Sequence, residues 1–296
     1  MKVNKTITIG ANTLNPITIK RFGYGTMRLT GEMVWGEPKN RTEALQILKT
    51  AVERGIRFID TADFYGEDVT NRLICEALLP YPNDLVVATK VGTIRGKDKS
   101  WNNYTKPENL RSSIENNLRT LQVDQIQLAH LRVMPSSDVP FEASLEEMFK
   151  MQQEGKIQHV GLSNVSLEEL EKALKAGTIA SVENAFGYGQ RTSFESHGQQ
   201  YRGLQQVIGL CKENIIPMIP FWSLQNSSSK EGDKISEIAK KYDTTTAQIN
   251  LAWLLHYDNL MLPIPGTFKL KHFEENLDAF EIKLTEEDLS FLNFLE

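Results

Sequence analysis

The sequence is poor in cysteine and contains no long hydrophobic run. Its two cysteines, Cys75 and Cys211, lie in separate helix-like segments and lack the spacing of metal ligands. We therefore expect reduced thiols and no bound metal. No apolar stretch is long enough to span a membrane, and the N-terminal residues lack the apolar core of a signal peptide. These absences predict a cytoplasmic protein with no membrane partner.

Strongly basic segments are absent as well. The net charge is −5 at pH 7, and no long run of lysine and arginine occurs. A nucleic acid or an acidic membrane surface is therefore not expected as the main partner. The hydrophobic content of 40% over 296 residues is enough for one large core or two smaller ones. We expect a monomer whose partner is a small molecule.

Short apolar segments alternate with segments of helical period over most of the chain. Several of the apolar segments are hydrophobic nearly throughout, which is typical of parallel strands that are buried on both faces. The predicted strands are 22–27, 57–61, 85–90, 125–131, 158–163, 181–186, 216–221 and 260–265. The predicted helices between them include 41–54, 108–121, 145–154 and 168–176.

Eight strand–helix units in fewer than 300 residues favour a closed (β/α)8 TIM barrel over an open sheet. The alternation of residues 6–19 around an Asn-Pro turn predicts an N-terminal β-hairpin that covers the barrel floor. Residues 244–256 would form the seventh barrel helix, so residues 233–242 and 284–295 would be two extra helices. Because no linker or low-complexity tract occurs, we predict a single domain over residues 1–296.

Residues with polar groups recur at one place in the predicted strands. They lie at or just after the C-terminal ends of the second to seventh strands, and they are Asp60, Lys90, His130, Asn164, Glu183 and Trp222. In a barrel these ends converge on the top face, where enzymes of this fold carry their active sites. The repeated placement predicts a site built from several strands.

Four side chains near these ends have the chemistry for proton transfer to a carbonyl group. A phenol such as that of Tyr65 has a reference pKa of about 10 and is a weak acid unless its anion is stabilised. Lys90 would stabilise that anion, and Asp60 would keep the lysine charged and oriented. His130 would bind the carbonyl oxygen and assist proton delivery. We therefore interpret the chain as a carbonyl reductase that uses a nicotinamide cofactor.

Taken singly, each of these residues also has a structural explanation. Asp60 can cap the following turn, Lys90 can be a strand-end surface charge, and His130 can be a hydrogen-bonded core residue. The occurrence of all of them at matching strand ends favours the catalytic interpretation.

Five motifs in the chain resemble those of the aldo-keto reductases. They are FGYGTMRL at 22–29, FIDTADFYG at 58–66, VVATKVG at 86–92, IQHVGLSNV at 157–165 and PIPGTFKLKHFEEN at 263–276. The resemblance extends over nearly the whole chain. It implies an oxidoreductase that transfers a hydride from NADPH to a small aldehyde or ketone. It also implies a catalytic tetrad with Tyr65 as the proton donor, formed by Asp60, Tyr65, Lys90 and His130.

The same resemblance implies contacts with NADP(H). Ser163 and Asn164 would hydrogen-bond the nicotinamide carboxamide, and Phe221 would stack on the ring. The further implied contacts are Gly25, Thr26, Met27, Asp60, Glu183, Trp222, Ser223, Leu224, Gly266, Thr267, Lys269, His272, Glu275 and Asn276.

The segment that follows Gly266 also bears on the choice of cofactor. Gly266 and Thr267 are predicted to open a helix whose free N–H groups suit a phosphate. Lys269, Lys271 and His272 add positive charge, which favours NADPH over NADH, although neighbouring glutamates partly offset it. A Rossmann fingerprint is not present, because Arg28 stands where the third glycine after Gly23 and Gly25 is needed.

The chain departs from the family pattern at three places. Glu183 replaces the usual glutamine, and an ionised glutamate accepts hydrogen bonds but cannot donate them. Phe221 to Leu224 replace the usual Tyr-Ser-Pro-Leu, and His272 replaces the usual arginine for the 2′-phosphate. These departures concern the cofactor and leave the tetrad unchanged.

Apolar residues at the predicted top face are candidates for the substrate pocket. They are Met27, Trp35, Phe64 and Trp101, and each of them can equally anchor a loop. Two other functions stay open. A regulatory protein on the same fold can bind NADP(H) with little turnover, and a different barrel enzyme can bind a phosphosugar. Loss of NADPH absorbance with a panel of carbonyl compounds distinguishes these alternatives.

Overall fold

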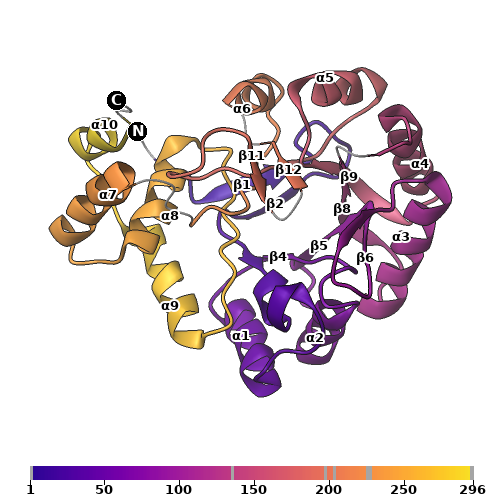
Figure 1. Cartoon of the computed structure of the whole chain (residues 1–296), viewed down its shortest axis with the longest axis horizontal. Helices are drawn as coiled ribbons and strands as arrows, with labels where there is room; N and C mark the ends of the chain where they lie inside the picture. The colour runs from indigo at the N-terminus through magenta and orange to yellow at the C-terminus, as the bar shows by residue number, and fades with distance from the viewer. Residues whose placement is uncertain (1–2, 135–136, 197–198, 203–204, 225–228, 294–296) are drawn as a thin grey trace.

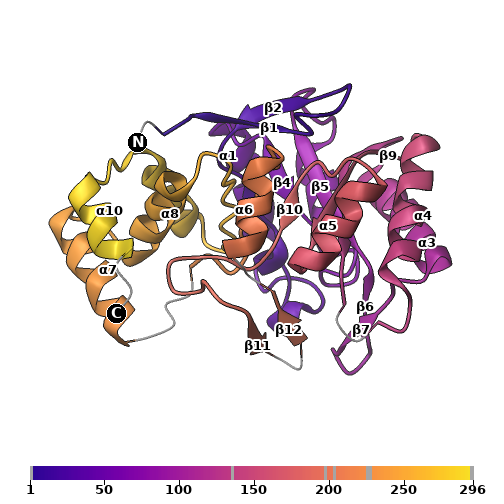
Figure 2. The same ribbon diagram turned by 90° about the horizontal axis from the view of Figure 1, so that it is seen from above.

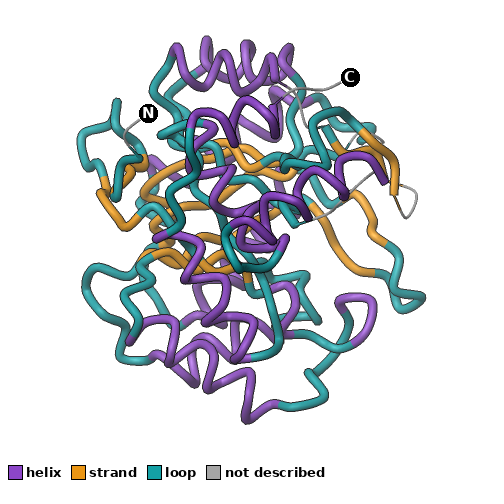
Figure 3. Tube along the Cα trace, turned by 90° about the vertical axis from the view of Figure 1, so that its left-hand side faces the viewer, coloured by secondary structure: helices purple, strands orange, loops and turns teal. Residues whose placement is uncertain are grey.

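A parallel sheet lies at the centre of the molecule, and helices pack around its outside (Figures 1 and 3). The computed structural model describes residues 3–134, 137–196, 199–202, 205–224 and 229–293. The sheet has the strand order β10-β9-β8-β5-β4-β3. Its strands are β3 (Tyr24–Gly25), β4 (Phe58–Asp60), β5 (Val86–Val91), β8 (Ile126–Arg132), β9 (Ile157–Ser163) and β10 (Val182–Glu183).

The seventh and eighth predicted strands form isolated parallel bridges instead of continuous strands. Met218 bridges Val182 on one side and Met261 on the other. The Gly23 N–H donates to the Pro263 carbonyl over 2.9 Å, so the last segment also contacts the chain just before β3. Prolines explain the interruption, because residues 216–221 and 260–265 each contain two and proline cannot donate a ladder hydrogen bond.

Three antiparallel hairpins flank the parallel sheet (Figure 2). The pair β1 (Thr6–Ile9) and β2 (Ile17–Lys20) lies at one end, where the Gly10 N–H donates to the Ala180 carbonyl over 3.2 Å. At the opposite end lie two hairpins that we did not predict from the sequence. They are β6 (Thr93–Arg95) with β7 (Trp101–Asn103), and β11 (Phe194–Ser196) with β12 (Gln199–Tyr201).

Helices occur at all the positions where we predicted them. Those around the sheet are α1 (Arg41–Glu53), α2 (Val69–Leu78), α3 (Pro107–Leu121), α4 (Phe141–Gln153), α5 (Leu167–Ala176), α6 (Gln205–Glu213), α8 (Thr246–Tyr257) and α9 (Leu270–Asp278). The extra helices are α7 (Ser229–Lys241) and α10 (Glu286–Asn293), and the predicted end of α10 at residue 295 lies outside the described residues. Among the described helices, none has the length and apolar character that crossing a membrane requires.

Local sequence fixes several helix boundaries. Ser166 and Glu169 form a reciprocal capping box at the start of α5, which satisfies N–H groups that have no partner within the helix. Pro107 occupies the first turn of α3, where its missing N–H carries no penalty. Cys75 in α2 and Cys211 in α6 are buried free thiols, as predicted.

The alternation of side chains along the strands leads directly to the site. One set of strand residues packs inside the curved sheet, and it includes Phe58, Ala88, Leu128 and Ile219. Since side chains on a strand alternate in direction, the residue two positions later points to the same side. Those later residues are Asp60, Lys90, His130 and Phe221. An apolar interior therefore gives way to polar side chains at the C-terminal ends of the strands.

Candidate active site

Lys90 lies at the centre of a buried cluster of charged side chains. Its Nζ donates to an oxygen of Asp60 and, over 3.2 Å, to the Thr61 carbonyl. It also lies 3.3 Å from Oε1 of Glu183, and its side chain is only 3% exposed. Burial disfavours the ammonium, but the acidic groups beside it, first Asp60 and then Glu183, outweigh this effect and raise the pKa of Lys90 above its usual value. Lys90 is therefore charged in the resting cluster.

Tyr65 follows β4 in a loop and packs beside this cation. The Lys90 Nζ lies 5.2 Å from the centroid of the Tyr65 ring. Burial raises the pKa of Tyr65, and the Lys90 charge opposes that rise while the charges of Asp60 and Glu183 add to it. The structure thus brings Asp60, Lys90 and Tyr65 together as the sequence predicts, with the phenol in its protonated form.

His130 belongs to the same cluster, and its imidazole is completely buried. Its Nε2 lies 2.9 Å from the Ser181 hydroxyl, and its Nδ1 lies 3.5 Å from Oε2 of Glu183. Gly161 makes room for the ring, because a Cβ at that position would lie 2.4 Å from the His130 Cδ2. Burial and the nearby Lys90 charge lower the pKa of His130 to about 3. The ring is therefore neutral, and its contact with a carbonyl oxygen stays a prediction.

Glu183, which stands where the family resemblance implies a glutamine, adds a further ionisable group to the cluster. Its side chain is 1% exposed, and its Oε1 lies 3.3 Å from the Lys90 Nζ. Burial and the Asp60 charge raise the pKa of Glu183 to about 8, although Lys90 and Arg132 oppose the rise. Burial therefore favours the protonated form of Glu183 at neutral pH.

Ser163 and Asn164, the residues expected to bind the nicotinamide, lie at the end of β9. They differ in their hydrogen bonds. Ser163 pairs in register with Glu183, and its buried Oγ has no hydrogen-bond partner among the described residues. Asn164 follows β9 and uses both ends of its side-chain amide on the backbone near β12. It donates to the Gln200 carbonyl over 3.0 Å and accepts from the Arg202 N–H over 2.8 Å.

The end of the first strand, β3, hydrogen-bonds the backbone of Asp60. Both the N–H and the hydroxyl of Thr26 donate to the Asp60 carbonyl, over 3.0 and 2.9 Å. Gly25 pairs with Asp60 in register, and it also approaches Gly266, where a Cβ would lie 2.6 Å from the Gly25 carbonyl oxygen. Thr26 and Gly25 thus fix the end of β4 and the start of the 266–269 segment.

The helix that we expected to begin at Gly266 begins later. Helix α9 starts at Leu270, with Lys269 as its N-cap residue. The Thr267 hydroxyl accepts from the Lys269 N–H over 3.2 Å, which holds the preceding turn outside the helix. The Leu270 N–H donates to Glu43 over 3.3 Å, so a carboxylate already lies at the helix N-terminus. Lys269 and His272 are exposed, whereas Glu275 is partly buried and Asn276 is buried.

The remaining expected cofactor residues lie in the segment that follows the seventh predicted strand. Phe221 bridges Ala185, and its side chain is partly exposed. Trp222 adopts a positive φ of 57° and is also partly exposed. Ser223 is buried, and Leu224 packs partly buried against the core beneath.

An apolar cluster lies around Tyr65 and includes Phe64, Met27 and Trp101, three of the four residues predicted to line the substrate pocket. Phe64 makes edge-to-face contacts with the rings of Tyr65 and Trp101, with centroids 5.3 and 5.8 Å apart. Met27 packs against the same cluster. Trp35 joins it indirectly, because the Arg95 guanidinium lies 5.8 Å from the Trp35 ring and 4.1 Å from the Trp101 ring.

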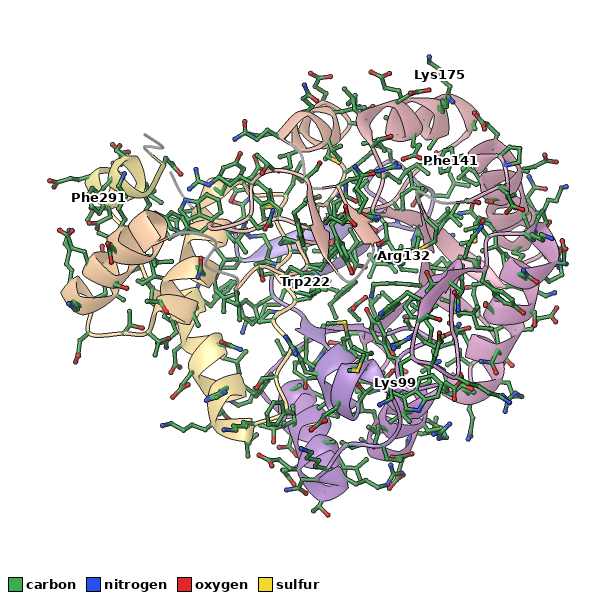
Figure 4. The ribbon with its side chains drawn as sticks, in the orientation of Figure 1. Lys99, Arg132, Phe141, Lys175, Trp222 and Phe291 are labelled. Carbon is green, nitrogen blue, oxygen red and sulfur yellow. The ribbon has the colours of Figure 1, made fainter. Side chains whose placement is uncertain are left out.

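Two residues near the site were missed in the sequence analysis. Arg132 ends β8 two positions after His130, and its guanidinium lies 5.7 Å from the Tyr201 ring and 5.9 Å from the Phe221 ring (Figure 4). Tyr201 in β12 also contacts the ring of Trp222, with centroids 5.7 Å apart. The period of two along β8 could have identified Arg132, whereas Tyr201 lies in a segment with no strong sequence pattern.

A buried polar network supports the strands from behind. Asn117 in α3 accepts from the hydroxyl of Thr89 over 2.7 Å and from the amide of Asn71 over 2.9 Å. Asn71 in turn accepts from the hydroxyl of Thr61 over 2.9 Å. Thr61 and Thr89 adjoin Asp60 and Lys90 in the chain, so this network fixes the backbone that carries the ion pair.

Comparisons with known proteins agree with this arrangement. The aldo/keto reductase family model matches residues 21–294. The chain is 36% identical to pyridoxine 4-dehydrogenase of Escherichia coli over 98% of both chains. It is also 36% identical to an uncharacterized oxidoreductase of Schizosaccharomyces pombe, over 94% of this chain and 87% of that one.

Solved structures share the fold. A thermostable aldo-keto reductase in complex with the inhibitor epalrestat superposes with a TM-score of 0.80 at 27% identity, covering 97% of this chain and 98% of that one. A Klebsiella pneumoniae aldo/keto reductase in complex with NADP and acetate has a TM-score of 0.77 at 22% identity, covering 98% of this chain and 95% of that one. From its sequence and its fold, this chain belongs to the aldo/keto reductase family.

Proposed function

We propose that this protein is an NADPH-dependent reductase of small aldehydes or ketones, with Tyr65 as the proton donor. The observation that carries this proposal is the buried arrangement of Asp60, Lys90 and Tyr65 beside an apolar cluster. A cation next to a phenol helps the phenol to donate a proton to a developing alkoxide, because the positive charge stabilises the phenolate. The apolar cluster of Phe64, Met27 and Trp101 suits the carbon skeleton of a small substrate.

The residues present fit a nicotinamide cofactor, which supplies the hydride when it is bound. The Ser163 hydroxyl is buried without a partner among the described residues, a state that costs about 1–3 kcal/mol and that a ligand amide would relieve. Phe221 offers a partly exposed ring at the neighbouring strand end. The exposed Lys269 and His272 would hold the 2′-phosphate. The NADP complex of the Klebsiella relative supports the same cofactor for this chain.

In this proposal each residue of the tetrad has a separate task. Tyr65 gives its hydroxyl proton to the substrate oxygen as the hydride arrives. Lys90 stabilises the resulting phenolate through its positive charge, and Asp60 keeps Lys90 charged and oriented. Neutral His130 lines the same cluster and contributes no charge that would compete with Lys90.

We further propose that the curved sheet closes into the eight-stranded barrel predicted from the sequence. The bridges of Met218 to Val182 and Met261, and the hydrogen bond from Gly23 to Pro263, support closure between β10 and β3. A closed barrel would place all the strand ends that carry the tetrad on one rim.

A panel of carbonyl compounds with NADPH tests the proposed function. Because a relative at 36% identity is a pyridoxine 4-dehydrogenase, pyridoxine with NADP+ belongs to the panel as a test of the oxidative direction. We expect a decrease in NADPH absorbance with at least one small aldehyde. If NADPH binds but no compound is turned over, the protein is instead an NADP(H)-binding regulator on the same fold.

A further inference from the structure

The cluster around Lys90 holds one more ionisable group than the tetrad needs. Glu183 places Oε1 3.3 Å from the Lys90 Nζ and Oε2 3.5 Å from the His130 Nδ1. Its Oε2 has no hydrogen-bond partner among the described residues. A carboxyl buried at this depth and in contact with the central cation needs an explanation beyond packing.

We infer that Glu183 is an internal proton reservoir. After Tyr65 has given its proton to the substrate, the proton of Glu183 replaces it by way of Lys90. This inference rests on the proposed reductase function and adds a residue to its proton path. The geometry that supports it is a chain of contacts from Glu183 to Lys90 and from Lys90 to the Tyr65 ring.

The charge balance of the cluster explains why Glu183 holds a proton before the reaction. Asp60 and Glu183 share the single ammonium of Lys90, and burying a second carboxylate beside it leaves an uncompensated charge. Burial raises the pKa of both carboxyl groups, but Asp60 has the closer contact with Lys90. We therefore assign the negative charge to Asp60 and the proton to Glu183. The other charged or titratable groups that face Glu183 are neutral His130, the phenol of Tyr65 and the Arg132 guanidinium.

The proton transfers balance over one reduction. Tyr65 breaks its O–H bond to protonate the substrate oxygen, while the cofactor hydride forms the C–H bond. Lys90 then gives a proton to the Tyr65 phenolate, and Glu183 gives its own proton to Lys90. The cluster ends with ionised Glu183, charged Lys90 and a protonated Tyr65. Water restores the Glu183 proton after the alcohol leaves.

Infrared spectroscopy of a single turnover tests this inference. With wild-type protein at about pH 7, the band of a protonated carboxyl group should disappear in step with NADPH oxidation, with one carboxyl lost for each NADPH. At about pH 10 Glu183 is ionised from the start, so the loss should vanish. Because these two measurements use the wild-type protein, they do not depend on whether a variant folds.

Two variants identify the carboxyl group. Glu183→Gln keeps the shape of the side chain but cannot release a proton, so the band loss should be absent. Glu147→Gln removes a glutamate of α4 that pairs with Arg111 at 2.6 Å, outside the cluster, and should leave the band loss unchanged. NADPH oxidation without loss of the carboxyl band would contradict the role of Glu183 as a proton reservoir. A loss of this band in Glu183→Gln as large as in the wild type would contradict it as well. If no carbonyl compound is reduced at all, the proposed function fails instead.

Discussion

The Lys90 ammonium contacts the carboxyl groups of both Asp60 and Glu183, and Glu183 also lies 3.5 Å from the Nδ1 of His130. The family pattern has a neutral glutamine at this position, so the chain has gained a group that can change its charge inside the site. Arginine and lysine side chains elsewhere in the protein pair mostly at the surface, where such pairs contribute little. The three-residue cluster is therefore where a substitution should have its largest functional effect.

Substitution of Glu183 by glutamine should change the relative affinity for the two cofactor forms. The oxidised nicotinamide ring carries a positive charge that the reduced ring lacks. A carboxylate within about 4–6 Å would favour the charged form by on the order of a kcal/mol. Because Glu183 ionises only around pH 8, its preference for NADP+ should grow as the pH rises through that value. This preference is measured from the dissociation constants of NADP+ and NADPH for the wild type and Glu183→Gln, at about pH 7 and about pH 9. An affinity ratio that is the same in the two proteins at both pH values would show that Glu183 only mimics glutamine.

The same substitution should increase stability at alkaline pH. The pKa of Glu183 is raised in the folded protein, so the folded state retains a proton that the unfolded chain releases above about pH 4.3. The wild type should therefore lose stability relative to Glu183→Gln as the pH rises toward 8, and the difference should be constant above that value. Thermal unfolding of both proteins at several pH values checks this. A difference in Tm that does not vary with pH would contradict the buried, protonated carboxyl.

The polar network behind the strands should contribute strongly to stability. Replacement of Asn117 by alanine leaves the Thr89 hydroxyl and the Asn71 amide with one partner fewer. Each buried polar group that loses its partner costs about 1–3 kcal/mol. We expect a large decrease in the free energy of unfolding in urea, together with slower turnover as the strand ends shift. Ser112→Ala, on the exposed face of the same helix, is the control and should change neither. Equal stability of the two variants would argue against the network.

Coenzyme preference should depend on the cations near the start of α9. If Lys269 and His272 hold the 2′-phosphate, NADPH should bind more tightly than NADH, and Lys269→Met should reduce the difference. The margin should also shrink as the pH rises, because an imidazolium loses its charge near neutrality. Competition between the two coenzymes at pH values on either side of neutrality measures this preference. Equal affinities at acidic pH would exclude this role for both residues.

The sequence predicts the parts of the fold that depend on regular patterns. Lys90 and His130 lie near strand ends as predicted, because β5 and β8 are buried almost throughout and therefore appear in the sequence as continuous apolar runs. The strand at 260–265 was predicted too long, since its prolines interrupt the ladder hydrogen bonds. The predicted start of α9 was four residues too early, because the Thr267 hydroxyl accepts from the Lys269 N–H and holds this turn outside the helix.

Contacts between segments that are distant in the chain could not be predicted from the sequence. The hairpin β11–β12 brings Tyr201 to Phe221 and Trp222, and no local pattern encodes that packing. The protonation of Glu183 likewise depends on Asp60 and Lys90, which come from two other strands. Sequence motifs therefore point to the residues of the proposed tetrad, while the protonation of these residues depends on the three-dimensional arrangement.

Turnover of Tyr65→Phe with NADPH and a reactive aldehyde tests the central claim most directly. In the proposed mechanism the Tyr65 hydroxyl acts only on the substrate oxygen, so its loss should reduce kcat by about 100-fold or more while NADPH binding stays within a few-fold of wild type. Tyr257→Phe, which removes a hydroxyl on α8, is the matched control and should keep full activity. Near-normal turnover by Tyr65→Phe would contradict the assignment of Tyr65 as the proton donor and, with it, the proposed mechanism.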